Sequence, residues 1–241
     1  MNIIDIIKKA DQYINTLETP SGYKLFNRSE VSPFARCIVI FNKFLTKQSD
    51  WLQKRKQHLI SDLNTDLHIL YQEKITNKVD WKYDKAFLQL YCFTLSSLNI
   101  LDGQLDEKNT EILKKILDID FKKNLEEKSV HKGASKSGNH SMFFAIFNIY
   151  ANNYLSINRS NQINEWLEFN CNSINSNGFW GDDVKMDYKQ FQNGYHQYEI
   201  LRYFDVKGDY WELAANHILK LQDKDSKFAP YPGGGGCFDL D

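Results

Sequence analysis

The chain has 241 residues, which is long enough for one large hydrophobic core or two small ones. Its 30 Lys+Arg nearly balance 31 Asp+Glu, and this formal net charge of −1 argues against a nucleic-acid partner, which usually requires a basic excess. With only 4 prolines and no Ser/Gly-rich spacer, residues 1–241 are expected to form a single domain.

The N-terminal apolar run is short and contains Asp5, so it does not fit a signal peptide. No stretch approaches the roughly 20 apolar residues of a membrane span, so no membrane partner is expected. The four cysteines are scattered without a CxxC pair, which indicates neither a disulfide framework nor a zinc site. These features predict a cytoplasmic protein that needs no metal and no cofactor.

Apolar residues recur mostly at helical spacing, and strand-like alternation is absent over any useful length. The expected helices span about residues 2–17, 33–45, 49–63, 82–101, 106–117, 139–154, 162–172, 190–204 and 210–221. The segment 82–101 is apolar on most sides, whereas 106–117 is amphipathic. Such alternation favours two concentric helical layers over a simple bundle. The predicted fold class is all-α, as an α/α toroid.

Two segments in the second half of the chain resemble each other. Each has an amphipathic helix, a polar turn and an aromatic residue, which is Phe179 in the first segment and Phe228 in the second. The phrase from Gln222 to Phe228 is similar to the repeat of terpenoid cyclases and protein prenyltransferases, which are α/α toroids. That resemblance implies a protein that binds an isoprenoid in an apolar cavity.

The segment 136–141 contains an Asn139-His140 pair directly before an apolar helix. Asparagine is a favoured N-cap, so Asn139 can simply satisfy free backbone N–H groups of that helix. This structural interpretation leaves His140 unexplained. A functional interpretation of the pair therefore stays open beside it.

The segment 191–199 is rich in polar and aromatic side chains. On a helix, Tyr195, Tyr198 and Arg202 share one face, and His196 and Glu199 share the adjacent one. If buried, these polar groups need hydrogen-bond partners, which either a water-filled cleft or an internal network can supply. Both a binding site and a structural network are consistent with this pattern.

The two segments together resemble the cleft signature of the heparinase and alginate-lyase type of polysaccharide lyase. In that family's toroid an Asn-His pair opens one helix, and a Tyr-His pair stands on another after a loop of glycine and aromatic residues. The resemblance spans about residues 138–236, and it implies β-elimination in a uronate-containing glycan. It assigns the substrate carboxylate to Asn139 and His140, acid or base chemistry to Tyr195, and a partner role to His196.

The chain ends in a phrase with four consecutive glycines, 230–241. No Lys-Ser/Thr follows them, so a phosphate-binding loop is excluded, and the glycines more readily let the backbone approach a ligand. Asp239 and Asp241 have the spacing of a possible Mg²⁺ or cyclase-type acidic pair. Because the sequence stops directly after this segment of closely spaced glycine, aromatic and acidic residues, we expect a toroid that is incomplete at its C-terminus.

The expected ligand is a glycan or another small molecule, and a non-catalytic toroid that only binds remains an alternative. The residues expected to contact substrate beside the Asn-His and Tyr-His pairs are Trp180, Tyr198, Glu199, Arg202, Tyr231, Gly234, Gly235 and Asp239.

Overall fold

The computed structural model describes residues 2–127, 137–181 and 188–222. Of these residues, 71% are helical, which confirms the all-α prediction. The toroid stays a prediction. The chain divides into two compact units, Met1–Ile116 and Leu117–Asp241, and each is described by itself. The expectation of a single domain concerns how these units associate, and it also stays a prediction.

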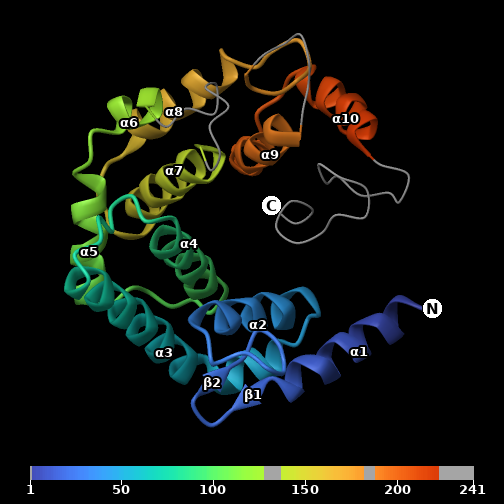
Figure 1. Cartoon of the computed structure of the whole chain (residues 1–241), viewed down its shortest axis with the longest axis vertical. Coiled ribbons are helices and arrows are strands. Elements are labelled where there is room, and N and C mark those ends of the chain that lie inside the picture. The colour runs from blue at the N-terminus through green and yellow to red at the C-terminus, as the bar shows by residue number, and fades with distance from the viewer. Residues whose placement is uncertain (1, 128–136, 182–187, 223–241) are drawn as a thin grey trace. The chain divides into compact units, whose positions relative to one another are not determined.

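Unit 1 contains five helices and a short hairpin in its described residues (Figure 1). The elements are α1 (Ile3–Thr16), β1 (Glu18–Thr19), β2 (Gly22–Tyr23), α2 (Pro33–Leu45), α3 (Ser49–Thr76), α4 (Lys85–Ile100) and α5 (Glu107–Leu117). Pro33 is the first residue of α2, where its missing N–H costs no helical hydrogen bond. The antiparallel hairpin, in which Glu18 faces Tyr23, was not expected because each of its strands has only two residues.

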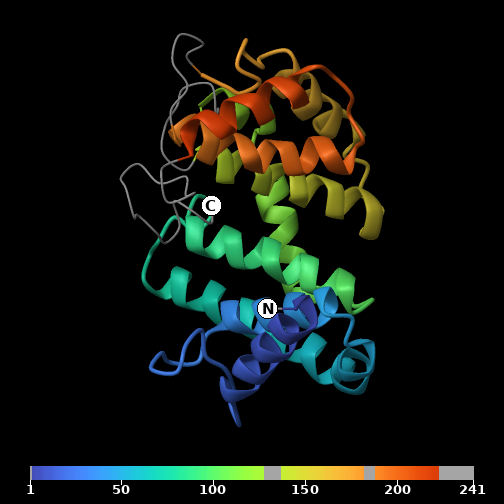
Figure 2. The same cartoon turned by 90° about the vertical axis from the view of Figure 1, so that its right-hand side faces the viewer.

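The core of unit 1 forms around α4, which packs against both α2 and α3 (Figure 2). As predicted, α4 is buried on most sides. Its N-terminus is capped by Asp84, whose carboxylate accepts the backbone N–H of Phe87 at 2.8 Å. In the middle of α3, the carbonyl of Asn64 accepts a hydrogen bond of 2.9 Å from the buried amide of Asn109, which fixes α5 onto α3.

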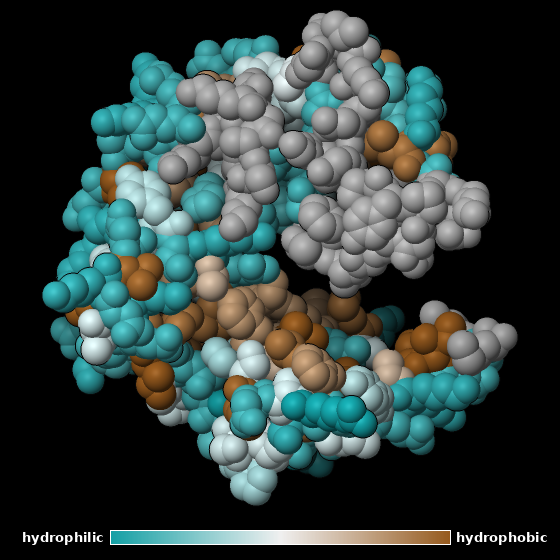
Figure 3. Space-filling view, viewed as in Figure 1, coloured by the Kyte–Doolittle hydropathy of each residue, from teal (hydrophilic) through white to brown (hydrophobic). Residues whose placement is uncertain are grey.

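Part of unit 1 presents an apolar surface. Figure 3 shows apolar residues gathered over α2 and α4, and the large exposed ones on α2 are Ile38, Phe44 and Leu45. Between α2 and α4, the ring of Phe93 meets those of Phe34 and Phe41 edge to face, with centroids 6.0 and 5.7 Å apart. Helix α2 therefore carries apolar side chains on its exposed face as well as on its buried one.

Unit 2 contains five helices in its described residues, built around α7. They are α6 (Phe121–Glu127), α7 (Ser137–Tyr154), α8 (Ser160–Cys171), α9 (Tyr188–Tyr203) and α10 (Tyr210–Leu221). Helix α7 packs against α8 and, most extensively, against α9 (Figure 1). The indole N–H of Trp166 on α8 donates to the backbone and side-chain oxygens of Ser141 on α7, at 3.1 and 3.0 Å.

Candidate functional site

The N-terminal turn of α7 lies directly on α9 because Gly138 has no side chain. A methyl group at Gly138 would come within 2.3 Å of the backbone oxygen of Asn193, a contact that real side chains do not make. The backbone N–H of Gly138 donates to Oδ1 of Asn193 at 3.1 Å, and its carbonyl accepts from Gln197 at 2.9 Å. Two polar side chains of α9 thus satisfy backbone groups at the start of α7.

This contact brings together two residues of the predicted site, Asn139 and His196, which lie 57 positions apart in the chain. Nδ2 of Asn139 is 2.8 Å from Nε2 of His196, and the two residues are only 3% and 6% exposed. With the amide assigned in this orientation, Nε2 accepts the hydrogen bond and the neutral imidazole carries its proton on Nδ1. The hydrogen bond therefore holds the imidazole of His196 against the amide of Asn139.

The position of Asn139 corrects the N-cap interpretation. Helix α7 begins at Ser137, so Asn139 lies inside the first turn, and its amide reaches across to α9. The pattern at this point predicted a helix start two residues too late. The side chain of Asn139 therefore joins two helices.

Tyr195 completes the cluster at its more exposed edge. Its ring lies against the imidazole of His196, with centroids 3.9 Å apart and planes inclined by 35°. Tyr195 is half-buried, whereas His196 and Asn139 are buried. His140 follows Asn139 on α7, is also half-buried, and packs its ring edge-on against Phe143 at 6.1 Å. We refer to Asn139, Tyr195 and His196 as the α7–α9 cluster.

Two other predicted contact residues, Trp180 and Tyr198, lie in an aromatic core. Trp180 is 1% exposed and its indole N–H donates to the carbonyl of Asn170 at 2.9 Å. The hydroxyl of Tyr198 donates to the carbonyl of Gly178 and lies 3.2 Å from that of Tyr210. Burial raises the pKa of this hydroxyl, so it stays protonated. In this arrangement both side chains support the loop before α9 and offer little surface to a ligand.

Glu199 and Arg202 lie at the surface of α9. Desolvation by neighbouring groups raises the pKa of the Glu199 carboxyl. The guanidinium of Arg202 is 3.9 Å from Asp205, and it lines a hollow of about 370 Å³ with Lys207 and Trp211. Four predicted contact residues, Tyr231, Gly234, Gly235 and Asp239, lie outside the described residues.

Sequence reasoning missed the residues that hold the cluster in place, Gly138, Asn193, Gly194 and Gln197. A methyl group at Gly194 would lie 2.4 Å from the ring of Phe179, so this glycine also permits a close approach. Glycine inside a helix lowers stability by about 1 kcal/mol relative to alanine. Its presence in the middle of a predicted helix was therefore a usable signal for tight packing.

The α7–α9 cluster combines an amide, an imidazole and a phenol. An amide N–H and an imidazole can stabilise negative charge on a ligand, and a phenol can carry a proton. Among the described residues, no group of three or more His, Cys, Asp or Glu is arranged to hold a metal ion. The three groups of the cluster can hydrogen-bond a ligand and transfer a proton.

None of the described helices has both the length and the apolar character that a bilayer-spanning helix needs. Comparisons of the chain with protein-family models, with curated proteins and with solved structures give no match.

Proposed function

We propose that the chain is a carbohydrate-active α/α-toroid protein, similar to polysaccharide lyases, that cleaves or binds a uronate-containing glycan. The observation that carries this proposal is the hydrogen bond of 2.8 Å between Asn139 and His196, with Tyr195 stacked on the same imidazole. These residues were selected from two short sequence motifs, and they meet through the tertiary contact of α7 with α9.

The proposed reaction is β-elimination. The oxygen of Tyr195, as the phenolate, accepts the proton from the carbon next to the uronate carboxylate, and the electrons of that C–H bond form a double bond. The bond from the next carbon to the glycosidic oxygen then breaks, and the leaving oxygen receives the proton back from Tyr195. Negative charge grows on the carboxylate during proton removal, and the remaining N–H of the Asn139 amide stabilises it.

His196 acts in this proposal as a positioning residue. Its Nε2 accepts from Asn139, and its ring supports that of Tyr195. Because a buried imidazole with a fixed hydrogen bond has little freedom to rotate, it holds the amide and the phenol at a constant separation. The half-buried Tyr195 is then the member of the cluster that meets the sugar.

A non-catalytic binding module is the second candidate. Asn139 and His196 are buried and hydrogen-bonded to each other, which is the arrangement expected if they stabilise the helix contact without taking part in chemistry. In that case the glycan would bind near Tyr195 and leave unchanged.

One experiment separates these candidates. The full chain is incubated with alginate, polygalacturonate and hyaluronan, and the ultraviolet absorbance of unsaturated uronate is followed while binding is measured by calorimetry. The lyase proposal expects absorbance to increase with at least one polymer. Binding without an increase supports the module, and neither binding nor an increase with any of the three contradicts both.

A further inference from the structure

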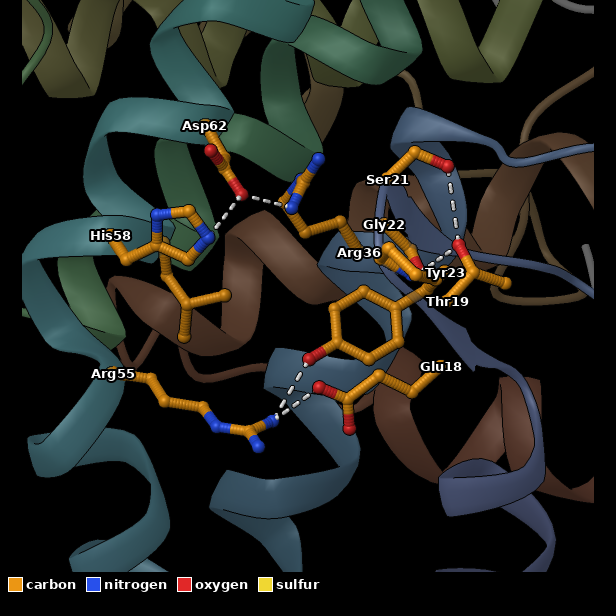
Figure 4. Close-up of a pocket in the computed structure, with 11 residues that line it drawn as sticks. Glu18, Thr19, Ser21, Gly22, Tyr23, Arg36, Arg55, His58 and Asp62 are labelled. Carbon is orange, nitrogen blue, oxygen red and sulfur yellow. Dashed lines mark hydrogen bonds and ion pairs between the residues drawn. The ribbon is translucent and has the colours of Figure 1, made fainter.

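A polar cavity of about 360 Å³ lies wholly within unit 1 between the β1–β2 hairpin, α2 and α3 (Figure 4). Pockets that bind small molecules measure roughly 300–1,000 Å³, so this one can hold a ligand of modest size. Arg36 enters it from α2, Arg55 and Asp62 from α3, and Glu18 and Tyr23 from the hairpin. It contains none of the α7–α9 cluster.

Arg36 forms the inner wall of this cavity. It is only 7% exposed, and its Nε donates to Asp66 at 2.8 Å while its Nη1 donates to Asp62. The remaining nitrogen, Nη2, faces Gly22, where a methyl group would be 3.3 Å from it. Gly22 has φ +139°, a conformation that favours glycine, so the hairpin leaves Nη2 room at the cavity wall.

Arg55 forms the opposite wall. Its guanidinium lies over the ring of Trp51, 4.5 Å from the centroid, which holds the planar group in one orientation. Its Nη1 donates to Glu18 at 2.9 Å and to the hydroxyl of the buried Tyr23 at 3.2 Å. The labelled side chains in Figure 4 thus form two separate arginine–carboxylate pairs around one cavity.

The charges of the cavity are already balanced by these pairs. A charged ligand would have to displace an existing ion pair, and the free energy lost with that pair would cancel much of the free energy of its own binding. Hydrogen-bonding capacity nevertheless remains, because Nη2 of both arginines, Oε2 of Glu18 and Oδ1 of Asp62 have no hydrogen-bond partner among the described residues. A ligand hydroxyl both donates and accepts, so neighbouring hydroxyls can use such a donor and acceptor together.

We propose that this cavity binds a neutral sugar. In this proposal one pair of sugar hydroxyls forms hydrogen bonds with Arg36 and Asp62, and another pair forms them with Arg55 and Glu18. The side-chain hydroxyls of Thr19 and Ser21, which lie 3.3 Å apart, complete the rim of the cavity. This inference does not rest on the lyase proposal, because it concerns a site in unit 1 that carries no reaction. It adds a second sugar-binding function to the chain.

The test uses the full chain and the methyl glycosides of glucose, galactose and mannose. Proton–nitrogen correlation spectra follow the indole signal of Trp51, assigned by its loss in Trp51→Phe, because this ring contacts Arg55. We expect a saturable shift with at least one glycoside. Arg55→Met should weaken that binding by about tenfold or more, the effect of losing hydrogen bonds to a charged group.

Lys54→Met is the matched control, since Lys54 is exposed, adjacent and not part of the cavity wall, and it should leave the affinity unchanged. Glu18→Gln changes the same wall of the cavity with a smaller change in side-chain shape, and it serves as the second variant if Arg55→Met lowers stability. Glu18→Gln should also weaken binding of the glycoside. The proposal is overturned if no glycoside shifts the signal, if both cavity variants bind as the wild type does, or if glycine or inorganic phosphate binds in place of the glycosides.

Discussion

Tyr198 lies with its hydroxyl between two backbone carbonyls of unit 2, those of Gly178 and Tyr210. Removing the hydroxyl in Tyr198→Phe leaves a part-buried carbonyl without its donor, so we expect the free energy of unfolding to fall by about 1–3 kcal/mol. Tyr203→Phe, on the same helix but 60% exposed, should change it by less than about 0.5 kcal/mol. Denaturant unfolding followed by circular dichroism measures both, and equal effects would refute this role of Tyr198.

Lys43 is 1% exposed in unit 1, and its ammonium donates to Asp11, Asn15 and Gln48. Asp11 is its only carboxylate partner among the described residues. Asp11→Asn leaves this buried charge uncompensated, so we expect a loss on the order of 3 kcal/mol in unfolding free energy. Asp5→Asn changes an exposed acid of the same helix and should be nearly neutral.

The loss of unfolding free energy in Asp11→Asn depends on pH through the pKa of Asp11. Burial raises this pKa, but hydrogen bonds from Lys43 and Gln48 outweigh burial and hold it below its usual value of 3.8. The stabilisation that ionised Asp11 gives is therefore complete above pH 3.8, the pKa of this carboxyl in the unfolded chain. It disappears as the pH falls through the lower pKa that Asp11 has in the folded protein. Wild type and Asp11→Asn should converge in stability on acidification. A difference that stays constant down to about pH 2 would contradict this assignment.

The predicted site residues differ in how well their neighbours could be foreseen. Asn139 and His196 were expected in one site, because their two motifs together resemble a lyase cleft, but the hydrogen bond between them was not predicted. The burial of Trp180 could not be predicted, because the sequence around a tryptophan does not distinguish a side chain in a cleft from one in a core. Only the tertiary contacts of the loop before α9 distinguish these two environments.

At the scale of elements, the contact between α7 and α9 depends on Gly138. Gly138→Ala places a methyl group against the backbone of Asn193, which cannot move as a flexible side chain can. We expect a loss of about 1–3 kcal/mol in unfolding free energy, although alanine favours helix by about 1 kcal/mol. Asn153→Ala, at the exposed end of α7, is the control, because it removes only exposed hydrogen bonds, among them one of 3.2 Å to Tyr203 on α9, and should have little effect. A Gly138→Ala variant as stable as the wild type would show that the helices are not held this close.

Helix boundaries could be predicted where an apolar stripe runs the full length of the element, as in α2 and α10. Helix α3 extends to Thr76, well beyond the predicted end near residue 63. The prediction stopped too early because apolar positions are sparse in this largely polar sequence. Helix α6 was missed because seven residues give too little periodicity. These errors have one cause, which is that tertiary contacts stabilise segments whose own pattern is weak.

At the scale of the whole chain, each compact unit contains a helix that is buried on most sides, α4 in the first and α7 in the second. The segment 82–101 was predicted to be apolar on most sides, and an apolar helix was predicted after the Asn139-His140 pair, so both helices were foreseeable parts of a core. The boundary between the units was not, because it falls at the end of α5 without a Pro- or Gly-rich spacer. The units carry the two proposed sugar sites, the cavity at Arg36 and Arg55 and the cluster at Tyr195.

The central claim is that Tyr195 transfers the proton in a β-elimination. Its most direct test is the rate of double-bond formation from the preferred uronate polymer by the wild type, Tyr195→Phe and Tyr203→Phe. Because Tyr195→Phe removes only the hydroxyl, we expect its kcat to fall by about 100-fold or more, while Tyr203→Phe turns over as the wild type does. A Tyr195→Phe variant that keeps the wild-type rate, with the same unfolding free energy, would contradict the account.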